Sequence, residues 1–235
     1  MSEFEIMSFD ASTFTGRVRL FPLPNLVLFP HVLQPLHIFE PRYRQMLEEA
    51  VAADRLIAMA LLAPGWEPLY DERPPLHPVA CLGRVATYHR LADGRYNLLL
   101  QGLKRVALVR ELPPTKLFRE AEVQVCEDNY PLEATAQRPA LQRDLLQAFR
   151  HALPRLPEGM DQLEHLLRAD VSLGMLTDLA AYTLELPLDI KQRLLAEPNV
   201  DCRAQTLLAE LRSLPAASGE SSAGRAKFPP DFSCN

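Results

Sequence analysis

The segment "LGRVATYHRLADGRYNLLLQGLKRVALV", residues 82–109, has two runs rich in apolar, aromatic and β-branched residues on either side of Asp93-Gly94. An Asp-Gly pair between two such runs favours a tight turn, because both residues tolerate the positive φ angles that hairpin turns need. Gly83 and Gly102 interrupt the runs and are typical of bulges or corners where strands bend. The segment therefore predicts a β-hairpin with bent strands.

The sequence around this hairpin favours further strands. Proline is frequent, with 21 prolines against 9 glycines, and proline cannot donate a hydrogen bond to a strand ladder. We therefore expect short, bent or edge strands, which suit a curled, barrel-like sheet better than a flat one. The expected strands are Arg17–Phe21, Leu26–Phe29, Val32–Phe39, Leu56–Leu62 and Ala121–Cys126.

A helix is expected directly after the strand that ends at Phe39. Pro41 suits the first position of a helix, and Glu40 can offer its carboxylate to the unpaired N–H groups there. The apolar side chains of the segment then fall on one helical face: Tyr43, Met46, Leu47, Ala50 and Val51. We expect Tyr43 to be buried on this face.

From Ala134 onward the apolar residues recur every three or four positions, which predicts helices. Expected helices include 160–170, one opened by Pro187, and 200–214 with Asn199 as its cap. The last residues are rich in Ser, Gly, Pro and Ala, a composition typical of disorder. The predicted fold class is α+β, with an N-terminal extension (1–16), a β-rich subdomain (17–130), a helical bundle (131–214) and a disordered tail (215–235).

Composition and charge argue against several classes of protein. The formal net charge is -5, and neither half of the chain is basic, whereas a nucleic-acid-binding protein needs a positive face. The N-terminus lacks the pattern of a signal peptide, and no apolar run is long enough to span a bilayer. We expect a cytoplasmic protein with no nucleic-acid or membrane partner. The cysteines show no metal-ligand spacing and are expected to be free thiols: Cys81, Cys126, Cys202 and Cys234.

Several side chains could in principle carry chemistry. His31 and His37 lie on a predicted strand without a cysteine or carboxylate at metal-ligand spacing, so we interpret them as structural. The carboxylate pairs Glu48-Glu49 and Asp71-Glu72 are interpreted as solvated surface groups. Ser172, followed by Gly174, stands at a helix start, where capping is the expected role. The sequence thus indicates no catalytic residue, metal site or cofactor.

Three stretches, taken in order, resemble the N-terminal substrate-recognition domain of Lon proteases. They are "LFPLPNLVLFPHVLQPLHIFEPRYRQML" (20–47), "CLGRVATYHRLADGRYNLLLQGLKRVAL" (81–108) and "LTDLAAYTLELPLDIKQRLLAE" (176–197). The resemblance covers about residues 17–214 and includes the P-L-P-x-x-x-x-F-P opening at Pro22–Pro30. It implies a β-rich pseudo-barrel followed by a helical subdomain.

The resemblance also implies recognition of unfolded polypeptide, or of a protein partner, rather than cleavage. The chain contains no G-x-x-x-x-G-K-[ST] phosphate-binding loop, G-x-S-x-G elbow or H-E-x-x-H motif. We therefore expect a non-enzymatic binding module with a role in protein quality control. No individual polypeptide-binding residue is indicated. Two alternatives stay open: a stand-alone peptidase or hydrolase with an unrecognised site, and a small-ligand receptor that uses the cleft between the subdomains. The oligomeric state is left open.

Overall fold

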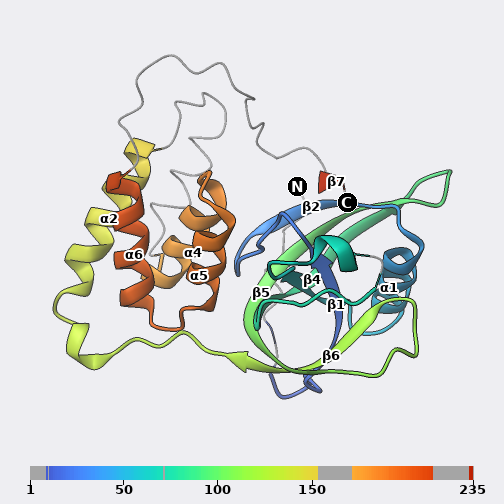
Figure 1. Cartoon of the computed structure of the whole chain (residues 1–235). Helices are drawn as coiled ribbons and strands as arrows, with labels where there is room; N and C mark the ends of the chain where they lie inside the picture. The colour runs from blue at the N-terminus through green and yellow to red at the C-terminus, as the bar shows by residue number, and fades with distance from the viewer. Residues whose placement is uncertain (1–8, 10, 71, 153–170, 214–232, 235) are drawn as a thin grey trace, which may run out of the picture.

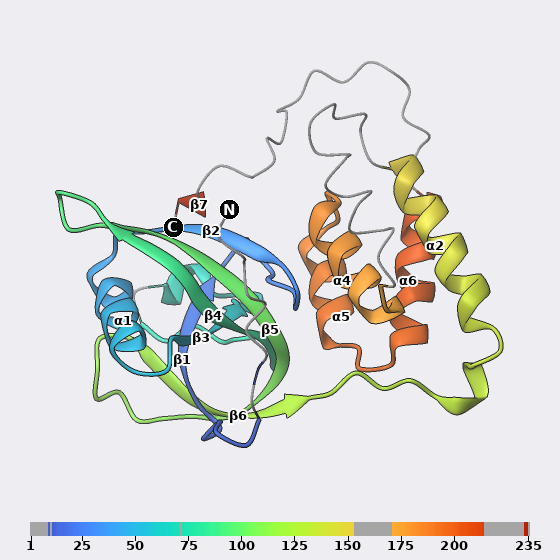
Figure 2. The same cartoon turned by 180° about the vertical axis from the view of Figure 1, so that it is seen from behind.

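The computed structural model describes residues 9, 11–70, 72–152, 171–213 and 233–234. A β-rich half and a helical half lie side by side, joined by the segment that follows β6 (Figures 1 and 2). The α+β class and the order of the two halves are as predicted. The β-rich half contains β1 (Arg17–Leu23), β2 (Leu33–Ile38), α1 (Pro41–Ala52), β3 (Leu56–Leu61), η1 (Glu67–Leu69), β4 (Val79–Arg90), β5 (Tyr96–Glu111) and β6 (Arg119–Cys126).

The strands of this half close into a ring. β4 pairs with β3, β3 with β1, β1 with β6 and β6 with β5, and β5 pairs back to β4. β5 is 16 residues long, so its first half also pairs with β2, on the same side as β6. The closed ring matches the predicted barrel-like sheet, and β2 extends it as a branch.

The hairpin formed by β4 and β5 has the predicted turn residues but a different turn. Leu91 and Arg95 face each other, with the Leu91 N–H bonded to the Arg95 carbonyl at 2.8 Å, so three residues form the loop. Of the three loop residues, only Gly94 has a positive φ, of 83°. This is the pattern of a type I turn followed by a bulge. Gly83 and Gly102 are direct register partners beside a bulge, as predicted.

Gly102 allows the chain to cross itself closely. A Cβ atom at this position would lie 2.0 Å from the carbonyl oxygen of Phe29. The N–H of Gly102 donates to the Val32 carbonyl at 2.8 Å, and its carbonyl accepts from the His31 N–H at 2.9 Å. A side chain here would push apart the two backbone segments that lead into β2.

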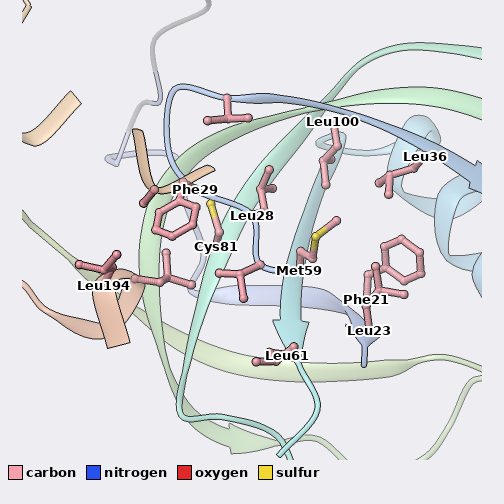
Figure 3. Close-up of a cluster of buried hydrophobic side chains, with 14 of the residues drawn as sticks. Phe21, Leu23, Leu28, Phe29, Leu36, Met59, Leu61, Cys81, Leu100 and Leu194 are labelled. Atoms are coloured by element: carbon pink, nitrogen blue, oxygen red, sulfur yellow. The ribbon is translucent and has the colours of Figure 1, made fainter. Parts of the chain in front are cut away.

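The strand predicted at Leu26–Phe29 is wrong. These residues form a loop between Pro24 and Pro30, yet Leu28 and Phe29 are fully buried. Figure 3 shows both side chains in the apolar cluster that also holds Cys81 and, from α5, Leu194. The apolar run therefore predicted burial correctly, but these residues pair with no strand of the described sheet.

Helix α1 begins at Pro41 as predicted, and it buries Tyr43, Met46, Leu47 and Ala50. Glu40 is at the N-cap position, but its side chain makes no capping bond. Its carboxylate instead accepts from Arg42 Nε at 2.8 Å and from the Tyr70 hydroxyl at 3.1 Å. The predicted capping role of Glu40 is therefore wrong, because stronger donors are within reach.

The helical half contains η2 (Leu132–Ala134), α2 (Arg138–Ala152), α4 (Leu173–Thr183), α5 (Leu188–Ala196) and α6 (Val200–Ser213). Asn199 Oδ1 accepts from the N–H groups of Asp201 and Cys202, so the predicted cap of α6 is confirmed. Pro187 is the N-cap residue of α5, one position before the helix. The predicted helix 160–170 lies outside the described residues. Of the predicted tail, only Ser233–Cys234 is described, as the short strand β7.

Apolar packing joins the two halves. One cluster of buried side chains runs from Phe21 and Met59 in the strands to Leu176, Leu194 and Leu207 in the helices. A smaller cluster, which includes Val18, Leu20 and Ala58, lies on the other face of the same strands. Because one core crosses the junction, the two halves form one compound unit rather than two independent domains.

Candidate functional site

The outer side of β2 is where the described sheet ends. β2 pairs with β5 on one side, and on the other side Leu36 and His37 are parallel register partners of Ser233 and Cys234 in β7. Figure 1 shows β7 next to β2 at one margin of the β-rich half. The five strands of the ring each pair with two neighbours, although the end of β4, from Thr87 to Arg90, pairs with β5 alone. We call the outer side of residues 33–38 the β2 edge.

The β2 edge is uncharged and partly apolar. Its sequence, LQPLHI, contains no Asp, Glu, Lys or Arg. Leu33 at its start is 43% exposed, and Phe39, directly after its end, is 37% exposed. Pro35 lies within β2, and proline is tolerated there because β2 is an edge strand. Natural edge strands are commonly protected by charge or by proline; this edge has no charged residue and is protected by Pro35 and by its two-residue pairing with β7.

Side chains hold the β2 edge in place from both ends. Gln34 is buried, accepts from the Tyr182 hydroxyl of α4 at 3.0 Å and donates to the Pro35 carbonyl at 2.9 Å. At the other end His37 Nδ1 lies 2.7 Å from Asn97 Oδ1, and Arg95 Nη1 lies 3.2 Å from His37 Nε2. The edge is therefore a rigid strand fixed to both halves of the protein.

A pocket of about 290 Å³ lies between the start of α1, the loop before β4 and the loop before β6. Tyr43 and Phe118 contribute apolar walls, and cationic side chains surround them. These cations are already paired, since Arg42 lies 2.8 Å from Glu40 and both Arg73 and Arg119 bind Glu111. The pocket belongs to the β-rich half, not to the junction of the two halves.

A buried ionic cluster, formed by Arg105, Asp128, Asp178 and Arg203, lies at the junction. Arg105 of β5 donates two hydrogen bonds to the carboxylate of Asp178 in α4. Arg203 of α6 donates two to Asp128, at 2.8 and 3.0 Å, and lies 3.7 Å from Asp178. The side chains of Arg105, Asp178 and Arg203 are 4%, 1% and 1% exposed.

Backbone groups complete this ionic cluster. Arg105 Nε donates to the Leu195 carbonyl and Arg203 Nη1 to the Glu197 carbonyl, both at 3.0 Å. Burial opposes ionisation of Asp128, but the hydrogen bonds and charge of Arg203, with the charge of Arg105, outweigh it and lower the pKa of this carboxyl. With every charge paired, the ionic cluster fixes the helical half against β5. We interpret it as structural.

The structure shows hydrogen-bond partners for the side chains of His37 and Ser172. His37 is held by Asn97 and Arg95, and His31 is exposed, with a φ of 67°. Partial loss of hydration lowers the pKa of His31 despite the nearby Asp178. Ser172 Oγ accepts from the Met175 N–H, so its predicted capping role is confirmed.

The carboxylates of Glu48 and Glu49 are engaged separately. Glu48 accepts from the Tyr96 hydroxyl at 2.7 Å, whereas Glu49 binds Arg19 and Lys116. Asp71 lies outside the described residues, and Glu72 is an exposed residue at the rim of the pocket. Glu48 and Glu49 therefore do not share one site.

Cys81, Cys126 and Cys202 are free thiols, as predicted, and burial raises the pKa of Cys81. Within the described ranges, no group of three or more His, Cys, Asp or Glu side chains is arranged to hold a metal ion. No helix in the described part of the chain combines the length and apolar character needed to cross a bilayer.

Sequence reasoning missed both the ionic cluster and the β2 edge. A signal for the ionic cluster was present, because Asp178 interrupts the apolar run "LGMLTDLAAY" on the buried face of its helix. Pro35 within a strand signals an edge, but not which neighbour lies beyond it. Both features depend on contacts between residues far apart in the chain.

Comparison with known proteins agrees with this architecture. Lon protease of Dictyoglomus thermophilum is 26% identical over 187 residues, which are 79% of this chain and 23% of that protein. Lon protease 1 of Bdellovibrio bacteriovorus is 27% identical over 200 residues, 85% of this chain and 25% of that protein. The chain thus spans about a quarter of the length of these curated relatives.

Solved structures share the fold. The N-terminal domain of a Mycobacterium avium complex Lon protease superposes with a TM-score of 0.65 at 16% identity, covering 85% of this chain and 100% of that one. A Lon N-terminal domain protein from Xanthomonas campestris gives 0.56 at 22% identity, covering 82% and 97%. The family model of the ATP-dependent protease La (LON) substrate-binding domain matches residues 17–213, and the chain therefore belongs to that family.

Proposed function

We propose that this chain is a non-catalytic module that binds unfolded polypeptide. The observation that carries the proposal is the match to a substrate-binding family over residues 17–213, without a match to a catalytic domain. Apolar side chains exposed on the β-rich half support it, since such groups bind unfolded chains: Leu33, Phe39, Leu69, Tyr88, Val109 and Leu117. A role in protein quality control follows from this ligand class.

The affinity for an unfolded chain should be modest. A client that becomes ordered on binding loses conformational entropy, and a single module lacks the avidity of several linked sites. We therefore expect a Kd in the micromolar range, on the order of 10 μM. Contacts made by apolar side chains and backbone groups should vary little with salt, unlike contacts with phosphate.

The proposal is tested by titrating fluorescently labelled casein into the purified protein, without ATP, at low and high salt. The expected result is saturable binding that changes less than about threefold between the two salts, and intact casein on a gel after long incubation. Casein fragments that persist after repeated purification would show that the chain is a hydrolase. Absence of binding at high micromolar protein would refute the polypeptide-binding role.

A further inference from the structure

We propose that the β2 edge is the client-binding site, where an extended polypeptide adds as a strand parallel to β2 in place of the chain's own Ser233–Cys234. The inference rests on the proposed function and names the surface, orientation and backbone register of binding. The occupant is an extended client segment without charged residues along the paired stretch.

The closure of the ring leaves few open strand edges. In the described sheet, β1, β3, β4, β5 and β6 each pair with strands on both sides, although the end of β4, from Thr87 to Arg90, pairs with β5 alone. β2 has β5 on one side and only the two residues of β7 on the other. Strand addition requires unpaired N–H and C=O groups on an edge, and the β2 edge supplies them.

The C-terminal residues show how a polypeptide fits there. Leu36 is the register partner of Ser233 and His37 of Cys234, and the two strands run parallel. β7 thus pairs with only two of the six residues of β2. A client that also pairs at positions of β2 other than Pro35, which has no N–H to offer, gains further backbone hydrogen bonds, and these let it displace β7.

The side chains around the edge define which client fits. β2 carries no charge that would repel or attract a particular partner, and the exposed Leu33 and Phe39 lie at its two ends. Cross-strand apolar neighbours stabilise a sheet, whereas a charge brought against them loses hydration without a partner. The Pro35 carbonyl is already bonded to Gln34, so the register seen for β7, beginning at Leu36, is the favoured one.

The covalent connection explains how so short a strand occupies the edge. Segments joined in one chain meet at an effective concentration on the order of millimolar, so a contact too weak to form between separate molecules can form within one. Ser233–Cys234 therefore competes with clients, and abolishing its pairing should strengthen client binding. We expect the Kd for the client to fall about two- to tenfold. This is the range expected when the competitor, Ser233–Cys234, is present at an effective concentration of about one to ten times its own dissociation constant.

A crosslinking experiment tests the internal pairing without any client. Register partners in neighbouring strands lie about 5 Å apart, within the range that a disulfide can bridge. His37→Cys in a full chain that also carries Cys126→Ser and Cys202→Ser should form an intrachain disulfide with Cys234 under mild oxidation. Thr87→Cys, an exposed position on β4, is the matched control and should not. Equal crosslinking at both positions, or none at position 37, would overturn the internal pairing, and a disulfide-linked dimer would assign the edge to a second copy.

Binding variants test the site itself with labelled casein. The double change Ser233→Pro and Cys234→Pro removes both N–H groups of β7 and should tighten binding, whereas Ser233→Ala with Cys234→Ala keeps them and should not. Leu33→Lys places a charge at the edge and should weaken binding about two- to fivefold. Leu132→Lys makes the same kind of change at a side chain that is 86% exposed in η2 of the helical half, away from the edge, and should have no effect.

The two proposals fail in different ways. If casein binds but neither the proline pair nor Leu33→Lys changes its Kd, the β2 edge is not the site and the polypeptide-binding function stands. If casein binds to none of the proteins, the polypeptide-binding function fails, and with it the client role of the edge.

Discussion

Asp178→Asn should strongly destabilise the protein, because it removes the negative charge that two buried arginines share. Asp178 accepts two hydrogen bonds from Arg105 and lies 3.7 Å from Arg203, and each of these side chains is less than 5% exposed. After the change, Asp128, 27% exposed, is the nearest remaining acid of the ionic cluster. Breaking a buried ion pair by removing one partner costs about 3–5 kcal/mol.

For a chain of this size, that loss corresponds to a fall in Tm of about 6–20 °C. The measurement is thermal unfolding followed by circular dichroism, together with urea unfolding at 25 °C. Asp144→Asn is the matched control, because Asp144 is 57% exposed and lies 3.8 Å from Arg212. An exposed pair of this kind contributes about 0–1 kcal/mol.

Replacing the pair by apolar side chains separates charge from shape. The double change Arg105→Met with Asp178→Leu removes both charges and leaves Arg203 with Asp128, so it should recover most of the stability lost in Asp178→Asn. A loss in Asp178→Asn no larger than that in Asp144→Asn would refute the view that the ionic cluster holds the two halves together. Native-like stability would then rest on the shared apolar core alone.

Three further predictions concern other parts of the fold. Gly102→Ala should lower the free energy of unfolding, measured with urea, by about 3 kcal/mol, because the added Cβ meets the Phe29 carbonyl. Gly83→Ala should cost less, because its Cβ first meets the movable Leu100 side chain. A larger loss of stability in Gly83→Ala than in Gly102→Ala would contradict this account. Tyr43→Asp should destabilise the fold by about 4 kcal/mol, since Tyr43 is 3% exposed and its ring centroid lies 4.6 Å from that of Phe21. Tyr88→Asp, at a 44% exposed site, should cost about 1 kcal/mol or less. Equal melting temperatures of the two variants would show that the α1 face is not buried. Because the folded protein lowers the pKa of Asp128, this carboxyl should stabilise the fold above about pH 4 and lose that contribution as the pH falls through its lowered pKa; an acid-unfolding midpoint that Asp128→Asn leaves unchanged would exclude this role.

Local patterns were sufficient for most of the secondary structure. The alternation and turn residues of 82–109 predicted the hairpin, and the spacing of apolar residues predicted α1 and α6, because period and turn chemistry are properties of neighbouring residues. The same patterns were wrong where a longer-range contact decided the outcome. Leu26–Phe29 is buried without being a strand, and the Glu40 carboxylate binds Tyr70 instead of capping its helix.

The candidate site could not be derived in this way. Whether β2 ends a sheet depends on which strands close the ring, and that closure pairs β6 with β1, two strands far apart in the sequence. The ionic cluster likewise joins Arg105, Asp178 and Arg203, which no spacing rule connects.

The sequence by itself therefore determined the class of fold, the order of its two halves and the resemblance to a substrate-binding family. The tertiary structure alone decided which backbone groups remain unpaired at the β2 edge and which charges are buried together at the junction. The physical reason is that hydrogen-bond satisfaction and desolvation are set by neighbours in space, and an apolar period specifies only which face of an element is buried.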